Sequence, residues 1–388
     1  TGIPFLRSEN LIFAGTDLTD IVFVSEKVHE IMKRSKILPN DVLLAIVGAT
    51  IGHTGLVGNE YSEYNSNQAI AIVRPENEKY SCYLSIVLET KFCQLQIERL
   101  KGGGSRDNLD LHEVRVLKIP RPDSKILNYC LGQIHKIRDL QKQLQTFYFQ
   151  AENLLLEELD LKNFSEEGNL SSVINLSDIK SARRMDAEYF QDKYERLASI
   201  IKNKKSKTLE NFVKEYSTGF PYKSENYQET GTPLIRINNI KKGFLDLSDT
   251  AYLSEKDCKI SPKDEAKSGD IVLSMSGTIG MSAIIPDNMP GGYVNQRILK
   301  FTSKDIDKNY LTLLLNSVVG LYQLERIGTG GVQTNISYKD IKNILIPILS
   351  EKIQKKIADL VRQSYEASKK AKQLLEEAKR KVEEMIEK

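Results

Sequence analysis

The chain offers few residues whose type and spacing suit catalysis. Pro122-Asp123 and Asp160-Leu161-Lys162 loosely imitate the PD…DxK pattern of metal-dependent nucleases, in which carboxylates hold a divalent cation. A long stretch with helical periodicity separates the two parts, whereas that chemistry requires carboxylates on paired strands. A stand-alone nuclease using Asp123 and Asp160 is therefore kept only as an alternative.

Other catalytic patterns are not found in the sequence. It contains neither a Gly-rich loop ending in Gly-Lys-Ser/Thr nor a strand followed by GxGxxG, and no Asn/Asp-Pro-Pro-aromatic segment. The cysteines form no CxxC pair, so we expect reduced thiols and neither a zinc site nor disulfides. The cysteines are Cys82, Cys93, Cys130 and Cys258, and the histidines, all in the first half, are His29, His53, His112 and His135. We therefore predict no catalytic residue, no metal and no cofactor.

The bulk composition is that of a globular protein. Of 388 residues, 40% are hydrophobic and 28% are charged, and the net charge is +3, too small to identify an anionic partner. The length favours two or more domains. The longest apolar stretch, around 311–322, is shorter than the ~20 residues of a membrane span, and Thr1 does not open a signal peptide. We expect a cytoplasmic protein without membrane segments.

An internal repeat organises these residues. Four ordered groups of residues recur at a nearly constant offset, which chance rarely produces. Thr1–Arg7 matches Thr230–Arg236, Asp41–Gly52 matches Asp270–Gly280, Asn67-Gln68 matches Asn295-Gln296, and Gly103-Gly104, Asn108 and Ile119-Pro120 match Gly330-Gly331, Asn335 and Ile346-Pro347. The chain is therefore interpreted as two copies of one unit.

Each copy begins with strands and ends with a long helix. Apolar runs that end at glycine, such as 42–47 and 271–273, are typical of buried strands. Apolar residues spaced by 3 and 4 then form a stripe from Ile134 to Leu159 and another from Ile353 to Met385. The predicted fold class is α+β, with two tandem mixed α/β domains, each followed by a long helix. We expect the two helices to pair as an antiparallel coiled coil, and the alternative is that each folds back on its own domain.

The predicted boundaries follow from this pattern. The first domain covers residues 1–128, the central helix 129–162, the second domain 163–347 and the C-terminal helix 348–388. The second copy has a segment from about Val173 to Glu229 ahead of its Gly-x-Pro motif, whereas the first copy begins at that motif. We therefore expect either that the first domain lacks its start or that the repeat is circularly permuted.

This pattern resembles the specificity subunit of type I restriction-modification systems. The resemblance covers nearly the whole chain. It rests on the duplicated acidic-strand-Gly-Thr-Ile-Gly segments (40–52 and 269–280), the Asn-Gln pairs, the Gly-rich loops and the Ile-Pro before each helix. Arg184–Phe190, with the sequence Arg-Met-Asp-Ala-Glu-Tyr-Phe, also resembles the opening motif of one half of such a subunit.

The resemblance implies a non-catalytic protein that binds double-stranded DNA. Each mixed α/β domain would be a target recognition domain for one half of a bipartite site, and the paired helices would fix the gap between the halves. Rigid helices suit this task because B-DNA advances ~34 Å per turn. Methylation of adenine and cleavage would belong to separate methyltransferase subunits, two of them, and to a restriction subunit that works as nuclease and translocase.

Candidate DNA-binding residues lie where the two copies correspond. Matched residues are expected to be scaffold, so differences such as His53/Met281, Ala69/Arg297 and Arg106/Gln333 are better candidates for reading different half-sites. Asn and Gln suit adenine, and Arg suits guanine or a phosphate. The full set comprises Arg7, Ser8, Glu9, Thr50, His53, Asn67, Gln68, Ser105, Arg106, Tyr222, Lys223, Arg236, Asn238, Asn239, Thr278, Asn295, Gln296, Arg297, Thr329 and Gln333.

Two kinds of alternative remain open at this stage. The Asn-Gln pairs and the Gly-Thr-Ile-Gly segments also suit purely structural turns, and the Gly-rich loops also suit simple connections. For the whole chain, a scaffold whose helices join proteins and whose domains do not bind DNA is the further alternative to the nuclease.

Overall fold

A computed structural model describes residues 2–19, 21–101, 108–165, 171, 173–247, 249–287, 289, 291–328 and 335–387, apart from the side chain of Ala49. The chain divides into two compact units. Unit 1 contains residues 1–144 and 366–388, and unit 2 contains residues 145–365. Each long helix is thus divided between the two units.

Unit 1 contains the first strands and helices of the chain and the last part of α12 (Glu351–Ile386). Its strands are β1 (Ile3–Leu6), β2 (Leu11–Ile12), β3 (Gly15–Thr16), β4 (Val22–Val24), β5 (Val42–Ala45), β6 (Thr54–Leu56), β7 (Asn65–Ser66) and β8 (Ile70–Val73). Its helices are α1 (Glu26–Ile31), α2 (Glu78–Leu88), α3 (Lys91–Leu100), α4 (Leu111–Val116) and the first part of α5 (Ser124–Glu158).

Unit 2 repeats this order with additional elements at its start. Its strands are β9 (Ser206–Thr208), β10 (Val213–Ser217), β11 (Thr232–Ile235), β12 (Ala251–Leu253), β13 (Glu265–Ala266), β14 (Ile271–Ser274), β15 (Ser282–Ile284), β16 (Gly292–Val294), β17 (Ile298–Ser303) and β18 (Leu345–Pro347). Its helices are α6 (Leu176–Ala182), α7 (Asp192–Lys202), α8 (Glu255–Cys258), α9 (Lys308–Asn316), α10 (Val318–Ile327), α11 (Tyr338–Ile341) and the first part of α12 (Glu351–Ile386).

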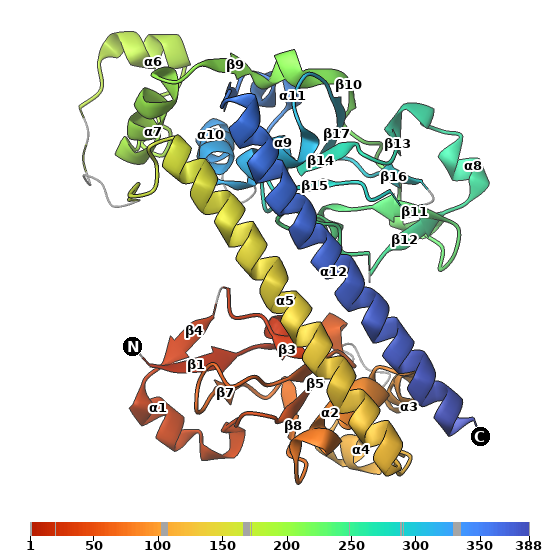
Figure 1. Ribbon diagram of the computed structural model, residues 1–388. Coiled ribbons are helices and arrows are strands. Elements are labelled where there is room, and N and C mark those ends of the chain that lie inside the picture. Colours follow the sequence, from red (N-terminus) through yellow and green to blue (C-terminus); the bar gives the residue numbers. More distant parts are fainter. Residues whose placement is uncertain are drawn as a thin grey trace. The chain divides into compact units, whose positions relative to one another are not determined.

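The two three-stranded sheets of unit 1 correspond to the two four-stranded sheets of unit 2, whose strands are labelled in Figure 1. Unit 1 has the orders β6-β5-β8 and β4-β1-β7, and unit 2 has β15-β14-β17-β10 and β12-β11-β16-β13. β1 pairs with β7 in parallel, and β11 pairs with β16 in the same way. β10 is an addition at a sheet edge of unit 2, whereas the place of β13 is taken in unit 1 by the isolated antiparallel bridge between Ile37 and Tyr64.

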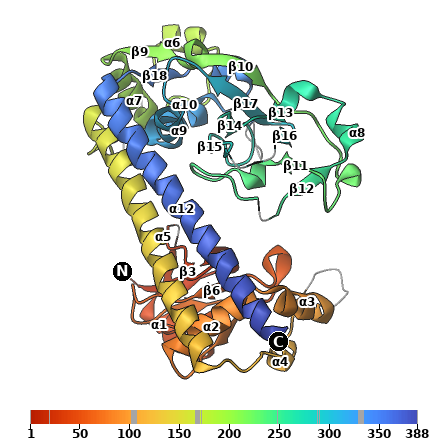
Figure 2. The same cartoon turned by 45° about the vertical axis from the view of Figure 1, so that its right-hand side comes forward.

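A helical hairpin covers the central sheet of each unit, and Figure 2 shows α9 and α10 beside β15. The central strands are buried on both faces, which explains why β5 and β14 are continuous apolar runs. Tyr83 of α2 donates its hydroxyl to the carbonyl of Pro120 at 2.8 Å, and Tyr310 of α9 donates to Pro347 at 2.9 Å. The duplication therefore extends to individual buried hydrogen bonds.

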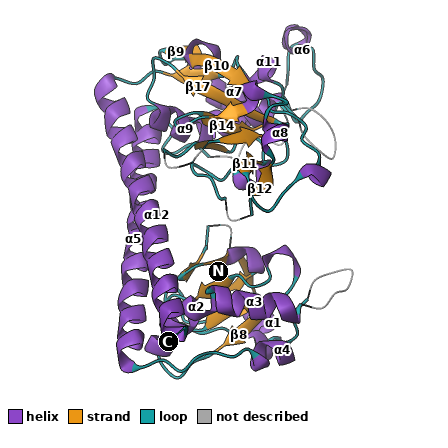
Figure 3. Ribbon diagram, turned by 90° about the vertical axis from the view of Figure 1, so that its right-hand side faces the viewer, coloured by secondary structure: helices purple, strands orange, loops and turns teal. Residues whose placement is uncertain are grey.

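The long helices lie side by side in opposite directions within each unit (Figure 3). In unit 1, Ile134 and Ile137 of α5 share a core with Ala378 and Val382 of α12 and with the buried face of α2. In unit 2, the end of α5 and the start of α12 join the core of the sheet in the same way. The predicted antiparallel pairing is confirmed within each unit, and each helix also packs on its own domain. The alternatives weighed from the sequence therefore occur together.

The helix boundaries differ from the predicted ones by a few residues. α5 begins at Ser124 and ends at Glu158, where the sequence predicted 129–162, and α12 spans 351–386 instead of 348–388. Asp123 explains the earlier start, because its side chain accepts the N–H of Ile126 at 2.8 Å. Asp160 adopts a left-handed backbone with φ of 59°, which ends α5 before the predicted residue. Over the residues that the structure describes, no helix combines the length and apolarity of a membrane span.

Candidate nucleic-acid interface

In unit 2, three turns and Asn335 meet at one end of the sheets. The turns are 236–239 after β11, 277–280 after β14 and 295–297 after β16. Backbone hydrogen bonds link the turns. Asn295 donates its N–H to Ile235 at 2.9 Å, Met275 donates its N–H to Arg297 at 2.9 Å, and Asn335 pairs with Ser276 as an isolated bridge. These segments form a single edge, which we call the turn edge of unit 2.

Unit 1 builds the same edge from the matching residues. Ile46 donates its N–H to Ala69 at 2.9 Å, as Met275 does to Arg297. Val47 pairs with Asn108, as Ser276 does with Asn335. The turn edge of unit 1 therefore consists of 7–10, 48–52, 67–69 and Asn108. The two units therefore hold these matching residues with matching backbone hydrogen bonds.

The first turn of each edge is held by a buried asparagine. Asn10 accepts the N–H of Arg7 at 2.8 Å, and Asn239 accepts the N–H of Arg236 at 2.8 Å. Asn239 is 1% exposed, and its amide nitrogen donates to backbone carbonyls of the same loop. The prediction that Asn239 presents its side chain to DNA is corrected by this burial, because its amide is used inside the fold.

The arginine of each first turn forms an ion pair with an acidic side chain. Arg7 pairs with Glu9 at 2.9 Å, and Arg236 pairs with Asp249 at 3.2 Å. Asn238, exposed beside them, donates to Asp249 at 3.1 Å. Ser8 is half-buried, whereas Glu9 is exposed. Asp249 was not singled out from the sequence, although it neutralises much of the charge that Arg236 brings to this edge.

The second turn has left-handed glycines in both units. Gly48 and Gly52 have φ of 81° and 92°, and Gly277 and Gly280 have φ of 68° and 86°, so this turn requires glycine. The adjacent side chains differ between the units. Thr50 is half-buried and Thr278 is exposed, while His53 is exposed where Met281 is half-buried.

In the third turn of each unit, the asparagine side chain bonds to the backbone, whereas the glutamine that follows it is exposed. The side-chain oxygen of Asn67 accepts the N–H of Ala69 at 3.1 Å, and that of Asn295 accepts the N–H of Gln296 at 2.8 Å. Asn295 also donates its amide to the hydroxyl of Tyr227 at 3.0 Å. Gln68 and Gln296 are exposed. The glutamine of each Asn-Gln pair is therefore the better candidate for a contact with bases.

Arg297 follows Gln296 and is also exposed. Its guanidinium donates from Nη1 to the side-chain oxygen of Asn335. Asn335 was recognised as matching Asn108 in the repeat but was not proposed as a site residue. The repeat itself held that signal, because Asn108 matches Asn335 while Ala69 matches Arg297.

The segment before β11 contributes one exposed candidate and one buried residue. Lys223 is exposed and lies 3.8 Å from Glu225. Tyr222 is 5% exposed and packs against the rings of Phe220 and Tyr293, and burial raises the pKa of its hydroxyl. Tyr222 is thus part of the interior, which corrects its prediction as a DNA contact. Ser105, Arg106, Thr329 and Gln333 lie outside the described residues.

The residues considered for metal chemistry have local partners. Asp123 caps α5, whereas Asp160 pairs with Lys204 at 2.6 Å. Asp123 belongs to unit 1 and Asp160 to unit 2. Within the ranges described above, no group of three His, Cys, Asp or Glu side chains is arranged to hold a metal ion.

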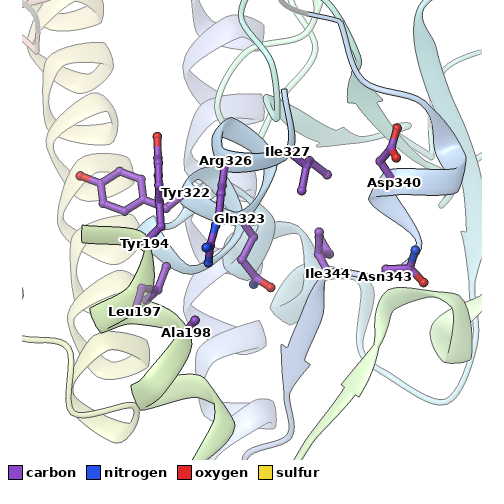
Figure 4. Close-up of a pocket in the computed structure, with 10 residues that line it drawn as sticks. All are labelled: Tyr194, Leu197, Ala198, Tyr322, Gln323, Arg326, Ile327, Asp340, Asn343 and Ile344. Atoms are coloured by element: carbon purple, nitrogen blue, oxygen red, sulfur yellow. The ribbon is translucent and has the colours of Figure 1, made fainter. Parts of the chain in front are cut away.

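A small cavity of about 150 Å³ lies elsewhere in unit 2, between α7, α10 and the residues after α11 (Figure 4). Its wall is mainly apolar, with Tyr194, Leu197 and Ile344 among the lining residues. Its charged lining residues have structural partners: Arg326 pairs with Glu195, and Asp340 caps α11 by accepting from Ser337. We assign no role in DNA contact to this cavity.

The comparisons with known proteins agree with the resemblance inferred from the sequence. Residues 201–380 match the model of the type I restriction modification DNA specificity domain. The type I restriction enzyme EcoKI specificity subunit of Escherichia coli K12 is 20% identical over 372 residues, which cover 91% of this chain and 73% of that protein. The MjaVIII specificity subunit of Methanocaldococcus jannaschii is 24% identical over 279 residues, covering 68% of this chain and 63% of that protein.

Solved structures of the same class are also similar. The S subunit from M. genitalium is 15% identical with a TM-score of 0.36, over 97% of this chain and 89% of that one. The HsdS subunit from Thermoanaerobacter tengcongensis is 13% identical with a TM-score of 0.33, over 100% of this chain and 90% of that one. Residues 201–380 thus match a type I DNA specificity domain, and the chain is similar to specificity subunits of type I restriction enzymes, the family that its repeat resembles.

Proposed function

We propose that this chain is a non-catalytic subunit that binds double-stranded DNA at a bipartite sequence, with one half-site read by each unit. The observation that carries the proposal is the pair of turn edges. Both share backbone hydrogen bonds at matching positions, yet the side chains there differ: His53 and Arg297 are exposed, whereas their counterparts Met281 and Ala69 are half-buried. A common scaffold with different exposed side chains is what two readers of different sequences require.

The long helices are proposed to fix the spacing between the half-sites. α5 and α12 have 35 and 36 residues. A continuous helix of this length extends roughly 50 Å at 1.5 Å per residue. Since B-DNA advances ~34 Å per turn, rigid helices of this length suit half-sites separated by unread base pairs. A flexible linker would tolerate many spacings, whereas rigid paired helices would favour one.

The catalytic steps are assigned to partner proteins. We infer that the chain recruits two methyltransferase subunits, because a repeated unit offers two equivalent docking surfaces. A restriction subunit would join the same complex for cleavage. The relatives named above are subunits of type I restriction enzymes, which supports these partners. Acting on DNA beside these enzymes, the chain would work in the cytoplasm.

The test is a map of methylated adenines in cells that express the full chain with its methyltransferase subunits. We expect a two-part sequence with one fixed gap. Replacing the exposed unit 1 residues Gln68 and His53 by alanine should relax only one part of that sequence. Methylation that persists without this chain, or a single uninterrupted recognition sequence, would contradict the proposal.

A second measurement addresses the nuclease alternative. The purified chain is incubated with duplex DNA and Mg²⁺ or Mn²⁺, with Asp160→Ala as the matched variant. We expect no cleavage by either protein. Binding measured at rising salt should weaken steeply for both, because phosphate contacts release counterions. Binding that is absent at every salt concentration would instead favour a scaffold that does not contact DNA.

A further inference from the structure

Arg297 differs from the other cationic candidates of the turn edges in the partner that it binds. Arg7, Arg236 and Lys223 each lie beside a carboxylate. Arg297 instead donates to the neutral side-chain oxygen of Asn335. Over the residues that the structure describes, no carboxylate pairs with Arg297, so its positive charge is oriented without being neutralised.

The backbone at Arg297 is also unusual. Its φ is 67°, in the left-handed region where a Cβ lies too close to the following carbonyl oxygen. Glycine would adopt this conformation without that close approach. Non-glycine residues in such conformations cluster at functional sites, where the surrounding structure enforces the strain. Here the carbonyl of Arg297 accepts the N–H of Met275 at 2.9 Å, which holds the turn in place.

The matching position in unit 1 cannot act in this way. Ala69 has no donor to offer, and it is absent from the residues with positive φ. Asn108, the counterpart of Asn335, donates its amide to Asp110 at 3.4 Å instead. The same scaffold asparagine therefore orients an arginine in one unit only.

We propose that Arg297, oriented by Asn335, is a specificity-determining residue that reads a guanine in the half-site of unit 2. This inference rests on the proposed function. Arginine has five N–H donors, and the bond from Nη1 to Asn335 leaves others for the O6 and N7 atoms of guanine in the major groove. Asn335 acts as a positioning residue, because it limits the directions in which the guanidinium points.

The experiment uses the full chain assembled with its methyltransferase subunits and a set of duplexes, each changed at one base pair of the mapped site. Arg297→Gly is the main variant, because it removes the side chain and also relieves the strained backbone. We expect binding to the cognate duplex to fall roughly tenfold to hundredfold. Discrimination should be lost at one G·C pair of one half-site and retained elsewhere, while the melting temperature is unchanged or higher.

A matched variant controls for the loss of charge. Lys223→Gln removes one exposed cation from the same unit, and it should lower affinity for all duplexes by a similar small factor. Asn335→Ala should reduce discrimination at the same base pair as Arg297→Gly, but by less, since the guanidinium is still present.

Three outcomes separate the hypotheses. If Arg297→Gly weakens all duplexes equally and lowers the salt dependence by about one counterion, Arg297 contacts a phosphate and the proposal is wrong. Unchanged binding and discrimination would also overturn it. If the unsubstituted complex shows no sequence preference in either half, the proposed function itself fails. That result differs from the two outcomes that overturn only the role of Arg297.

Discussion

The two units support the same turn edge to different extents. In unit 2, the segment from β10 to Gln228 lies against the sheets. β10 pairs with β17, Phe220 pairs with Asn295, and Gln228 pairs with Tyr252. Asn295 thereby gains the hydroxyl of Tyr227 as a second partner for its side chain. The third turn of unit 2 is held from two sides.

Unit 1 presents the corresponding surfaces with fewer neighbours. Among its described residues, no strand pairs with the outer edge of β8 or β4. Val22 and Phe23, which correspond to Ala251 and Tyr252, are 43% and 48% exposed. The covering segment therefore adds hydrogen bonds to a turn edge that the sheets of unit 2 also hold.

The largest expected effect comes from loosening this cover in unit 2. Gly219 has φ of 75°, and a Cβ there would lie 1.9 Å from the carbonyl oxygen of Asn295. Gly219→Ala therefore forces the segment away and breaks the backbone bonds of Phe220 to Val294 and to Gln296. With left-handed strain of about 1–2 kcal/mol and two lost hydrogen bonds, we expect unit 2 to lose about 3–4 kcal/mol.

Urea unfolding and hydrogen exchange of β16 and β17 measure this loss. The control is Gly291→Ala, which has φ of 95° but no atom of the described residues within 4 Å of the new Cβ, so only strain of about 1–2 kcal/mol is expected. Exchange in β5 and β8 of unit 1 should not change. Equal losses for the two variants would show that the cover contributes nothing to the stability of unit 2.

The second-largest expected loss of stability concerns a loop that packs on the long helices, around Ala14 in unit 1 and around Gly243 in unit 2. In unit 1, the guanidinium of Arg138 on α5 donates to the carbonyls of Ala14, Leu56 and Val57 at 2.9, 3.0 and 3.2 Å. Arg138→Ala leaves these acceptors without their charged donor. We expect a loss of about 3 kcal/mol in unit 1, since bonds from charged donors are stronger than neutral ones.

Tyr365 of α12 follows Pro347 at the same interval at which Arg138 follows Pro120. It packs with Tyr148 near Gly243, whose left-handed φ of 89° matches the φ of 60° at Ala14. Within the described residues, the buried hydroxyl of Tyr365 has no hydrogen-bond partner. Tyr365→Phe should therefore change the stability of unit 2 by less than about 0.5 kcal/mol. A large loss from this substitution would contradict attachment by packing alone.

The sequence predicted the parts of this fold that repeat. The buried runs that become β5 and β14, the glycine turns after them and the two apolar helical stripes were all visible, because each reflects a local rule of periodicity or backbone conformation. The two-residue strand β7 and the hairpin of α9 and α10 were not predicted. Such short elements depend on partners distant in the chain, so local patterns do not reveal them.

The candidate site was predictable in position but not in detail. The repeat located all three turns, whereas burial decided the roles of Tyr222 and Asn239. Asn239 looked like a base-reading amide, yet its counterpart Asn10 performs the same capping task in unit 1. A residue that is matched in both units and caps a turn is scaffold. The bond between Arg297 and Asn335 joins residues far apart in the chain, so the local patterns could not show it.

A further small effect is a pH dependence of the helix cap in unit 2. The helices that follow the central sheets are capped by Asn77 in unit 1 and by Asp307 in unit 2. Burial acts to raise the pKa of Asp307, but the N–H of Asn309 at 2.8 Å and Arg362 at 3.0 Å outweigh it. The pKa of this carboxyl is therefore held below its ordinary value of 3.8.

A carboxyl with a lowered folded pKa contributes stability above its unfolded pKa and loses it as the pH falls through the folded value. The cap of unit 2 should thus weaken as the pH falls below about 5 and through the lowered pKa, whereas Asn77 carries no charge to lose. Asp307→Asn keeps a good cap and removes the titration, so it should cost about 0.5 kcal/mol near neutral pH and progressively less as the pH falls below 3.8. The measurement is urea unfolding of both proteins across this range. A difference between them that stays constant with pH would show that the Arg362 pair is too solvated to matter, leaving the two caps equivalent.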